Sequence, residues 1–242
     1  MLYKERTYRN NLRGNTNLTD FTVCVHQSDL FIRADRDLSV EAREAILKYR
    51  YQIETHIRAF PDFLTSMYPL DNDNVLQSPD IICEMLRFSM LVGVGPMAGI
   101  AGAIAEFVGK ELLPLSDNII IENGGDIFIK TKNSVKTSIF AGTSNLSNKF
   151  SILIKPEMTP LGICTSSGTV GESISFGKAD AVCVTSKSTI LADCVATAIG
   201  NIINSPADIK AGLKLAQEIQ GVTGCIIIIG NKIGSWGEIE FC

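Results

Sequence analysis

The chain has 242 residues, of which 45% are hydrophobic and 20% charged, and this length suits one domain or two closely packed lobes. Its net charge of −4 argues against the concentrated basic surface that nucleic-acid binding requires. The first residues, Met1–Arg6, carry no apolar signal segment, and the seven cysteines form no Cys-x-x-Cys pair, which predicts a cytoplasmic protein without a disulfide framework or zinc site.

Strands dominate both ends of the predicted chain, with helices between them. In chain order, periodicity and turn residues predict an edge strand at 3–11, a hairpin of strands at 21–25 and 30–34, a helix at 39–58, an irregular segment at 60–69, helices at 78–91 and 97–113, strands at 119–121, 127–130, 137–141, 150–154, 161–164 and 181–185, helices at 188–203 and 207–219, and a final hairpin of strands at 225–229 and 233–239. This layout predicts an α+β fold.

Residues 88–105 contain no charged side chain and resemble a membrane span in composition. The stretch is short for a bilayer, and it is interrupted by Gly93, Gly95 and Pro96. We therefore predict a buried helix–turn–helix and no membrane partner. The apolar, glycine-rich central helices also suggest a homo-oligomer, most simply a homodimer.

Two glycine-rich segments are candidates for binding phosphate. Residues 93–98 fit the loose dinucleotide pattern G-x-G-x-x-A, but the preceding segment is predicted to be a helix, whereas that motif requires a strand. Asn123-Gly124-Gly125-Asp126 is a strong hairpin signal. The turn could be purely structural, or its glycines could expose amides to an anionic ligand beside Asp126.

Polar residues elsewhere suggest the same kind of ligand. The segment Thr165-Ser166-Ser167-Gly168 follows an apolar strand and offers hydroxyls and amides to phosphate oxygens, although a plain polar loop explains it equally well. Asp193 and Thr197 lie four residues apart on a predicted apolar helix and therefore share a face. Asp193 could cap a nearby loop, or the pair could hold a hard cation such as Mg²⁺.

Histidine chemistry has little support in the sequence. The chain has two histidines, His26 and His56, both in the first quarter, and neither belongs to a Ser/His/Asp order or a metal-binding pair. We expect His56 to be structural.

Four segments together resemble the ApbE-like family of flavin transferases, once called thiamine biosynthesis lipoproteins. Gly102-Ala103-Ile104-Ala105 resembles that family's Gly-x-Ile-Ala-Lys-Gly helix, and residues 121–126 resemble its strand ending in Gly-Gly-Asp. Residues 192–198 resemble its Ala-Asp-Ala-x-Ala-Thr-Ala helix, and residues 164–168 its Thr-Ser-Gly loop. The match covers roughly residues 95–205 in the family's order, and with residues 173–181 it is most similar to a short, distinct branch of that superfamily.

The resemblance implies an α+β fold with mixed sheets around central helices, and a site for FAD or FMN with Mg²⁺. Asp193, Thr197 and the carbonyl of Ala105 would bind the metal. The flavin nucleotide would lie against a set of residues from the hairpin and the polar loop: Gly124, Gly125, Asp126, Thr165, Ser166, Ser167 and Gly168.

Two departures from the family pattern bear on activity. Glu106-Phe107 stands where the family has Lys-Gly, and the His-Ile-x-Asp-Pro segment that carries the expected catalytic histidine is missing after the Thr-Ser-Gly loop. We therefore expect a protein that binds a flavin, a nucleotide or a phosphorylated metabolite, and the short branch is also associated with sulfur assimilation into homocysteine. The alternatives are a Mg²⁺-dependent FAD:protein FMN transferase with altered catalytic residues, and a non-enzymatic scaffold or partner protein.

Overall fold

The computed structural model describes residue 9 and residues 12–13, 17–71, 78–169 and 176–242. The expected edge strand at 3–11 lies outside the described residues except for Arg9, and so does the first part of the 173–181 segment.

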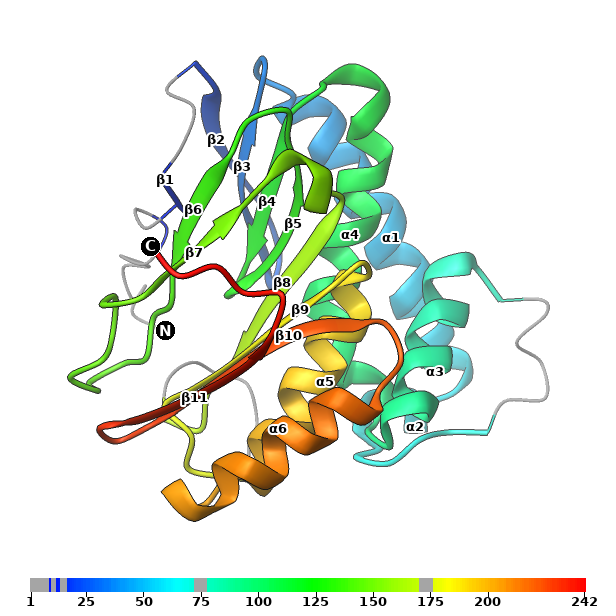
Figure 1. The fold of residues 1–242 in the computed structure, drawn as a ribbon. Coiled ribbons are helices and arrows are strands. Elements are labelled where there is room, and N and C mark those ends of the chain that lie inside the picture. Colours follow the sequence, from blue (N-terminus) through cyan, green and yellow to red (C-terminus); the bar gives the residue numbers. More distant parts are fainter. Residues whose placement is uncertain (1–8, 10–11, 14–16, 72–77, 170–175) are drawn as a thin grey trace.

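An eight-stranded sheet forms the centre of the protein (Figure 1). Its strands, in spatial order, are β11 (Lys232–Gly237), β10 (Val222–Ile229), β9 (Ala181–Ser186), β8 (Leu161–Ser166), β5 (Asp126–Lys130), β4 (Ile119–Asn123), β3 (Ser28–Ala34) and β2 (Thr19–Val25). Every pairing among the described strands is antiparallel, where the resemblance implied a mixed sheet. The predicted α+β class is confirmed.

The helices pack on one face of this sheet (Figure 1). They are α1 (Ser39–Ala59), α2 (Asp62–Thr65), α3 (Asp80–Val92), α4 (Ile100–Leu112), α5 (Thr189–Ile202) and α6 (Ile209–Glu218). The larger hydrophobic cluster lies in this layer and includes Ile121, Phe128 and Cys164 of the central strands. Because side chains alternate along a strand, these residues mark the face of the sheet that is turned toward the helices.

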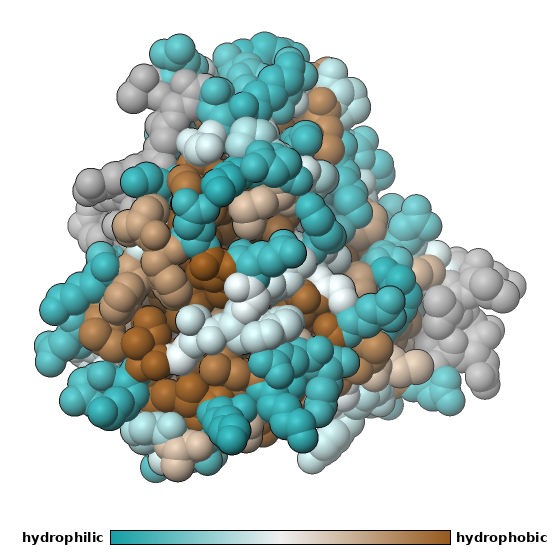
Figure 2. Space-filling model, viewed as in Figure 1, coloured by the Kyte–Doolittle hydropathy of each residue, from teal (hydrophilic) through white to brown (hydrophobic). Residues whose placement is uncertain are grey.

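A small sheet covers the opposite face. It consists of β1 (Leu12–Arg13), β6 (Val135–Ser138) and β7 (Ser151–Ile154), and a second cluster that includes Ile120, Ile129 and Ile163 fills the space between the two sheets. Hydrophobic residues lie on the surface at the lower left of this side of the molecule, where β11 forms the edge of the large sheet (Figure 2).

Local prediction and structure differ at a few places. The segment at 60–69 contains the short helix α2, whose Phe63 is fully buried. The helix predicted at 97–113 begins as a 3₁₀ helix over Pro96–Gly99 before α4. Thr165 and Ser166 belong to β8, because pairing with β9 continues to Ser166 opposite Val182.

No single helix among the described residues is long and apolar enough to cross a membrane. One pair passes the test by length and composition, Asp80–Val92 with Pro96–Leu115, and it is bent by 109°. The bend begins at Gly93, which ends α3 in the left-handed conformation with φ 85°. This is the predicted helix–turn–helix, and the helix before residues 93–98 removes the strand that a dinucleotide motif requires.

Candidate functional site at one end of the sheet

Several predicted residues meet where the β4–β5 turn approaches the start of α4. Gly124 and Gly125 form the two-residue turn with φ values of 70° and 109°, which favour glycine. Asp126 is the first residue of β5 and lies on the helix-facing side, two residues before Phe128. Leu30 of β3 pairs with Asn123, so the β2–β3 turn lies at this same end.

Asp193 of α5 reaches the first turn of α4. Its Oδ2 accepts a hydrogen bond from the amide of Gly102 at 2.9 Å, and the amide of Ala101 also bonds to the carboxylate. A Cβ at Gly102 would lie 2.6 Å from the carbonyl oxygen of Thr189, so glycine is what allows the two helices to come this close. Asp193 therefore caps α4 from a neighbouring helix, where the helix dipole favours a negative charge.

The carboxylates of Asp126 and Asp193 influence each other. Burial and the nearby charge of Glu122 raise the pKa of Asp126 to about 7, although hydrogen bonds from Cys164 and the Thr165 amide oppose this. Burial and the charge of Asp126 raise the pKa of Asp193 well above its ordinary value, against the two amides of α4. Among the described residues, no basic side chain is bonded to either carboxylate. The pair is therefore suited to hold a proton or a cation.

Cys164 is close enough to both acids for their charges to act on its thiol. Its Sγ lies 3.2 Å from the Thr189 carbonyl oxygen and also within hydrogen-bonding reach of Asp126, and its single proton is donated to one of these acceptors at a time. Burial, Asp126 and Asp193 all raise the pKa of the Cys164 thiol well above its ordinary value. The residue is therefore an uncharged thiol and not a reactive thiolate.

Two of the amides that were candidates for binding an anion have partners inside the protein. The Gly125 amide donates to Glu122 Oε1 at 2.8 Å, and the Gly168 amide donates to the Ala179 carbonyl at 2.9 Å. For the Gly125 and Gly168 amides, the structural alternative therefore holds, because each is bonded within the protein.

The Thr165–Gly168 segment is only partly directed at Asp126. The Thr165 hydroxyl bonds to Cys183 on the side of the sheet turned away from the helices. Ser166 alternates back to the Asp126 side. Ser167 accepts a hydrogen bond from the Thr169 amide at 3.1 Å, which ties the loop to itself.

The predicted metal set of Asp193, Thr197 and Ala105 does not converge. Helices α4 and α5 run antiparallel, since Gly102 meets Asp193 while Glu106 meets Thr189. Along the axes, Ala105 lies about 4.5 Å to one side of Asp193 and half-buried Thr197 about 6 Å to the other. Because Mg²⁺ binds its ligands at about 2.1 Å, one ion does not reach all three, and including Ala105 was wrong.

Ala101 stands closer to the acids than Ala105 does. Its carbonyl accepts a hydrogen bond from Asn123 Nδ2 at 3.1 Å, which joins the start of α4 to the turn that carries Asp126. The sequence contained a signal for this, because an Ile-Ala pair occurs at residues 100–101 as well as at 104–105. The structure begins α4 at the first pair.

Two charged residues at or near the site were not recognised from sequence. Glu106 is buried, and its carboxylate accepts hydrogen bonds from the Ser188 hydroxyl at 3.0 Å and the Thr189 and Ile190 amides at 2.6 and 3.2 Å, so it caps α5. Arg9 donates to Glu122 Oε2 at 2.7 Å across 113 positions of the sequence. A local sequence pattern does not predict an ion pair between residues so far apart along the chain.

The two histidines lie elsewhere in the fold. His56 is buried on α1, with its ring 4.9 and 4.8 Å from those of Phe60 and Phe63, and burial lowers its pKa. It is therefore a neutral core residue, which agrees with the structural role predicted for it but places it on the inner side of α1. His26 occupies the exposed β2–β3 turn with a positive φ of 53°.

Two cavities in the protein lie away from Asp193 and the glycine-rich segments. One, of about 290 Å³, lies between α1, α3 and α4 and is lined by residues that include Tyr49, Asp80 and Phe107. The other, of about 270 Å³, lies beside Leu113–Asp117 at the opposite end of α4. In the described part of the chain, no group of three or more His, Cys, Asp or Glu side chains is arranged to hold a metal ion.

Solved structures define the class of this fold. The flavinyl transferase ApbE of Pseudomonas stutzeri superposes with a TM-score of 0.56 at 14% identity, covering 91% of this chain and 94% of that one. The flavin transferase ApbE of Vibrio cholerae superposes with a TM-score of 0.59 at 11% identity, covering 91% and 97%. At these identities the likeness establishes a shared fold.

Sequence comparison then gives the family. The family model described as "AbpE bacteria" matches residues 9–224, and the chain belongs to this ApbE-like family. The UPF0280 protein of Methanocaldococcus jannaschii is 38% identical over 223 residues, covering 90% of each chain. The UPF0280 protein of Methanospirillum hungatei is 41% identical over 210 residues, covering 86% of this chain and 83% of that one. The predicted membership of a distinct ApbE-like branch is confirmed.

Proposed function

We propose that the protein binds a flavin nucleotide, FAD or FMN, together with a divalent cation at the Asp126–Asp193 end of the sheet. The observation that carries this is the pair of buried carboxylates to which no basic side chain is bonded among the described residues. Two such acids are costly to ionise together, and a divalent cation offsets that cost.

The donor set fits a hard cation. Magnesium takes oxygen ligands and keeps several waters, so two carboxylates are a sufficient protein contribution. Asp193 retains acceptor capacity beyond its bond to Gly102, and Asp126 retains capacity beyond its bonds to Cys164 and Thr165. The cation would supply positive charge for a phosphate or pyrophosphate group. Thr197, one helical turn from Asp193, is available to contact a water of the cation or the ligand.

Family membership favours a flavin nucleotide over other phosphate-bearing ligands. Two solved structures with this fold are named flavinyl transferase and flavin transferase, and the chain belongs to the ApbE-like family. We propose binding and not catalysis, because the described groups around Asp126 and Asp193 can hold a cation or form hydrogen bonds. A Mg²⁺-dependent FMN transfer to protein is the second candidate, and the shared fold is what favours it.

Calorimetric titration with FAD and FMN, with and without Mg²⁺, tests the proposal. We expect cation-dependent binding. In Asp193→Asn and in Asp126→Asn it should weaken at least about tenfold, which corresponds to a loss of about 1.4 kcal/mol of binding free energy. Asp117→Asn is the matched control, because that side chain is 68% exposed and lies beyond the other end of α4. If no flavin nucleotide binds, or if all three variants bind equally, the assignment is wrong and a scaffold role takes its place.

The transferase candidate has a separate test. Incubation with FAD, Mg²⁺ and a threonine-containing acceptor protein should join FMN to the threonine hydroxyl as the pyrophosphate bond of FAD breaks and AMP leaves, and the mass increase of the acceptor measures this. A role in sulfur assimilation rests on the resemblance alone. Cytoplasmic location, homo-oligomerisation and the absence of nucleic-acid or membrane partners likewise stay predictions.

A further inference from the structure

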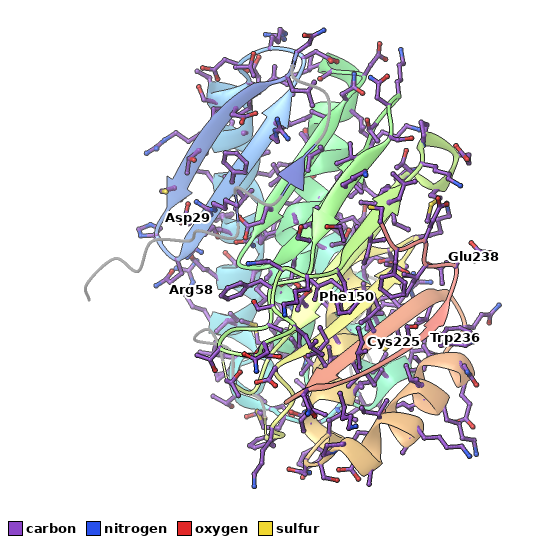
Figure 3. All side chains as sticks on the ribbon, turned by 60° about the vertical axis from the view of Figure 1, so that its left-hand side comes forward. Asp29, Arg58, Phe150, Cys225, Trp236 and Glu238 are labelled. Atoms are coloured by element: carbon purple, nitrogen blue, oxygen red, sulfur yellow. The ribbon has the colours of Figure 1, made fainter. Side chains whose placement is uncertain are left out.

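Arg9 joins the ligand end of the sheet from the beginning of the sequence. Its Nε donates to Glu122 Oε2 at 2.7 Å, and its other nitrogens donate to Asp29, to the carboxylate at 3.2 Å and the carbonyl at 2.7 Å. Asp29 stands at the β2–β3 corner of the sheet (Figure 3). The guanidinium also lies 5.9 Å from the centre of the Phe31 ring. Arg9 thus spans β3 and β4 beside the β4–β5 turn.

Glu122 transmits this contact to the turn. Its second oxygen, Oε1, accepts the Gly125 amide at 2.8 Å, so one carboxylate is bonded to Arg9 on one side and to the turn on the other. The Glu122 side chain is 2% exposed and that of Arg9 10%. In such a setting a charge-assisted bond is stronger and more directional than at the surface.

The turn needs such a restraint because glycine is conformationally free. Gly124 and Gly125 both have positive φ, and Asp126 follows directly. Any rotation of this dipeptide would move the carboxylate of Asp126 relative to Asp193. The bond from Gly125 to Glu122 opposes that rotation.

Removing Arg9 would affect the Gly124–Gly125 turn because the charge of Glu122 would lose its partner. Glu122 would become a buried carboxylate without its cation, in an area that already holds Asp126. A buried charge without a partner is costly, so the side chain rearranges toward water, and this change loosens its hold on Gly125. The chain itself would stay anchored close by, because Leu12 and Arg13 pair with Thr137 and Lys136 of β6.

We propose that Arg9 is a positioning residue for the ligand site: it holds Glu122, Glu122 holds the Gly124–Gly125 turn, and the turn presents Asp126 to the ligand. The role rests on the proposed function of this end of the sheet. The relay from Arg9 to the turn is present without any ligand and is therefore testable on its own.

The full-length chain with Arg9→Gln is the principal variant, and Arg33→Gln is its matched control. Arg33 also forms a 2.7 Å ion pair on the sheet, with Asp20, and its side chain is 11% exposed. Hydrogen exchange of the unliganded proteins, followed on the peptide that spans the β4–β5 turn, should be at least about tenfold faster in Arg9→Gln and unchanged in Arg33→Gln. Equal exchange in the two variants would overturn the relay.

Binding of FAD with Mg²⁺ supplies the second readout. Arg9→Gln should weaken Kd at least about tenfold and Arg9→Lys should recover part of the loss, while Arg33→Gln stays within about twofold. In a Glu122→Gln background, where the amide oxygen can still accept from Gly125, adding Arg9→Gln should have little further effect. A full and independent effect of Arg9→Gln in that background would overturn the relay through Glu122.

The two readouts separate the two proposals. Should the wild-type protein bind no flavin nucleotide, the proposed function fails, and the exchange comparison alone decides whether Arg9 controls the turn. Should wild-type binding be tight and Arg9→Gln bind equally well, the function stands and Arg9 is not a positioning residue. If Arg9→Gln does not fold, Arg9→Lys and Glu122→Gln carry the same comparison.

Discussion

The carboxylate of Glu106, on the middle of α4, lies 2.6 Å from the backbone nitrogen of Thr189, the first residue of α5. A buried acid on one helix thus caps the next helix, which carries Asp193 one turn further along. The same glutamate bonds to Lys110 at 2.6 Å, so its charge is balanced on both sides. This contact sets the position of α5 against α4, and through it the position of Asp193.

Replacing this acid tests the capping contact. Glu106→Gln should lower the free energy of unfolding by about 1–2 kcal/mol, because it removes a buried negative charge at a helix N-terminus. Urea denaturation at neutral pH gives the value. Glu111→Gln is the control on the same helix, with a side chain 44% exposed, and should change the free energy by less than about 0.5 kcal/mol. Equal effects of the two substitutions would contradict the assignment.

The raised pKa of Asp126 predicts how stability depends on pH. The folded state keeps its proton up to about pH 7, whereas the unfolded chain releases it near its ordinary value of about 4. The folded state therefore binds more protons in this window, and the stability contribution of the group falls as pH rises from about 4 to 7.

Asp126→Asn removes that dependence. The unfolding free energy of the variant minus that of wild type should be larger at pH 8 than at pH 5 by more than about 1 kcal/mol. The magnitude follows because one unit of pKa corresponds to about 1.4 kcal/mol. Denaturant titrations at the two pH values measure the difference. Asp117→Asn should show no such gain, and a constant difference between Asp126→Asn and wild type would refute the prediction.

His56 predicts a dependence of the opposite sign. Burial lowers its pKa, so the folded state holds it neutral while the unfolded chain takes up a proton below about pH 6.5. Its contribution to stability is lost as pH falls through that value. In His56→Phe, which keeps an aromatic ring beside Phe60 and Phe63, the fall in melting temperature from pH 7 to pH 5.5 should be smaller. His26→Asn, in the exposed turn, should leave the fall unchanged.

A close approach between β8 and α5 predicts a steric effect. A Cβ at Gly162 would lie 2.4 Å from the Cα of Thr189, a contact with backbone that cannot move aside. Gly162→Ala should therefore lower the free energy of unfolding by about 1–3 kcal/mol and weaken any ligand stabilisation that depends on Asp193. In Gly124→Asn, where the added Cβ meets nothing within 4 Å and asparagine tolerates positive φ, the loss should stay below about 1 kcal/mol.

Sequence alone predicted the helices and strands and singled out two acids of the candidate site, Asp126 and Asp193. Helical spacing in residues 39–58, the Asn-Gly turn and the apolar runs of β9 and β10 are local signals, and each element formed close to its predicted range. Asp126 and Asp193 were found through motifs of a few residues, because a turn and one face of a helix are both encoded within neighbouring positions.

Only the tertiary structure decided how these pieces meet. The antiparallel packing of α4 on α5 put Ala101, and not Ala105, near Asp193, and it turned Glu106 into a cap for Thr189. The pairing of Arg9 with Glu122 depends on strand order across the whole sheet. Such contacts join positions far apart in the chain, and the register and close approach that create them are set by packing many elements together, which no short stretch of sequence specifies.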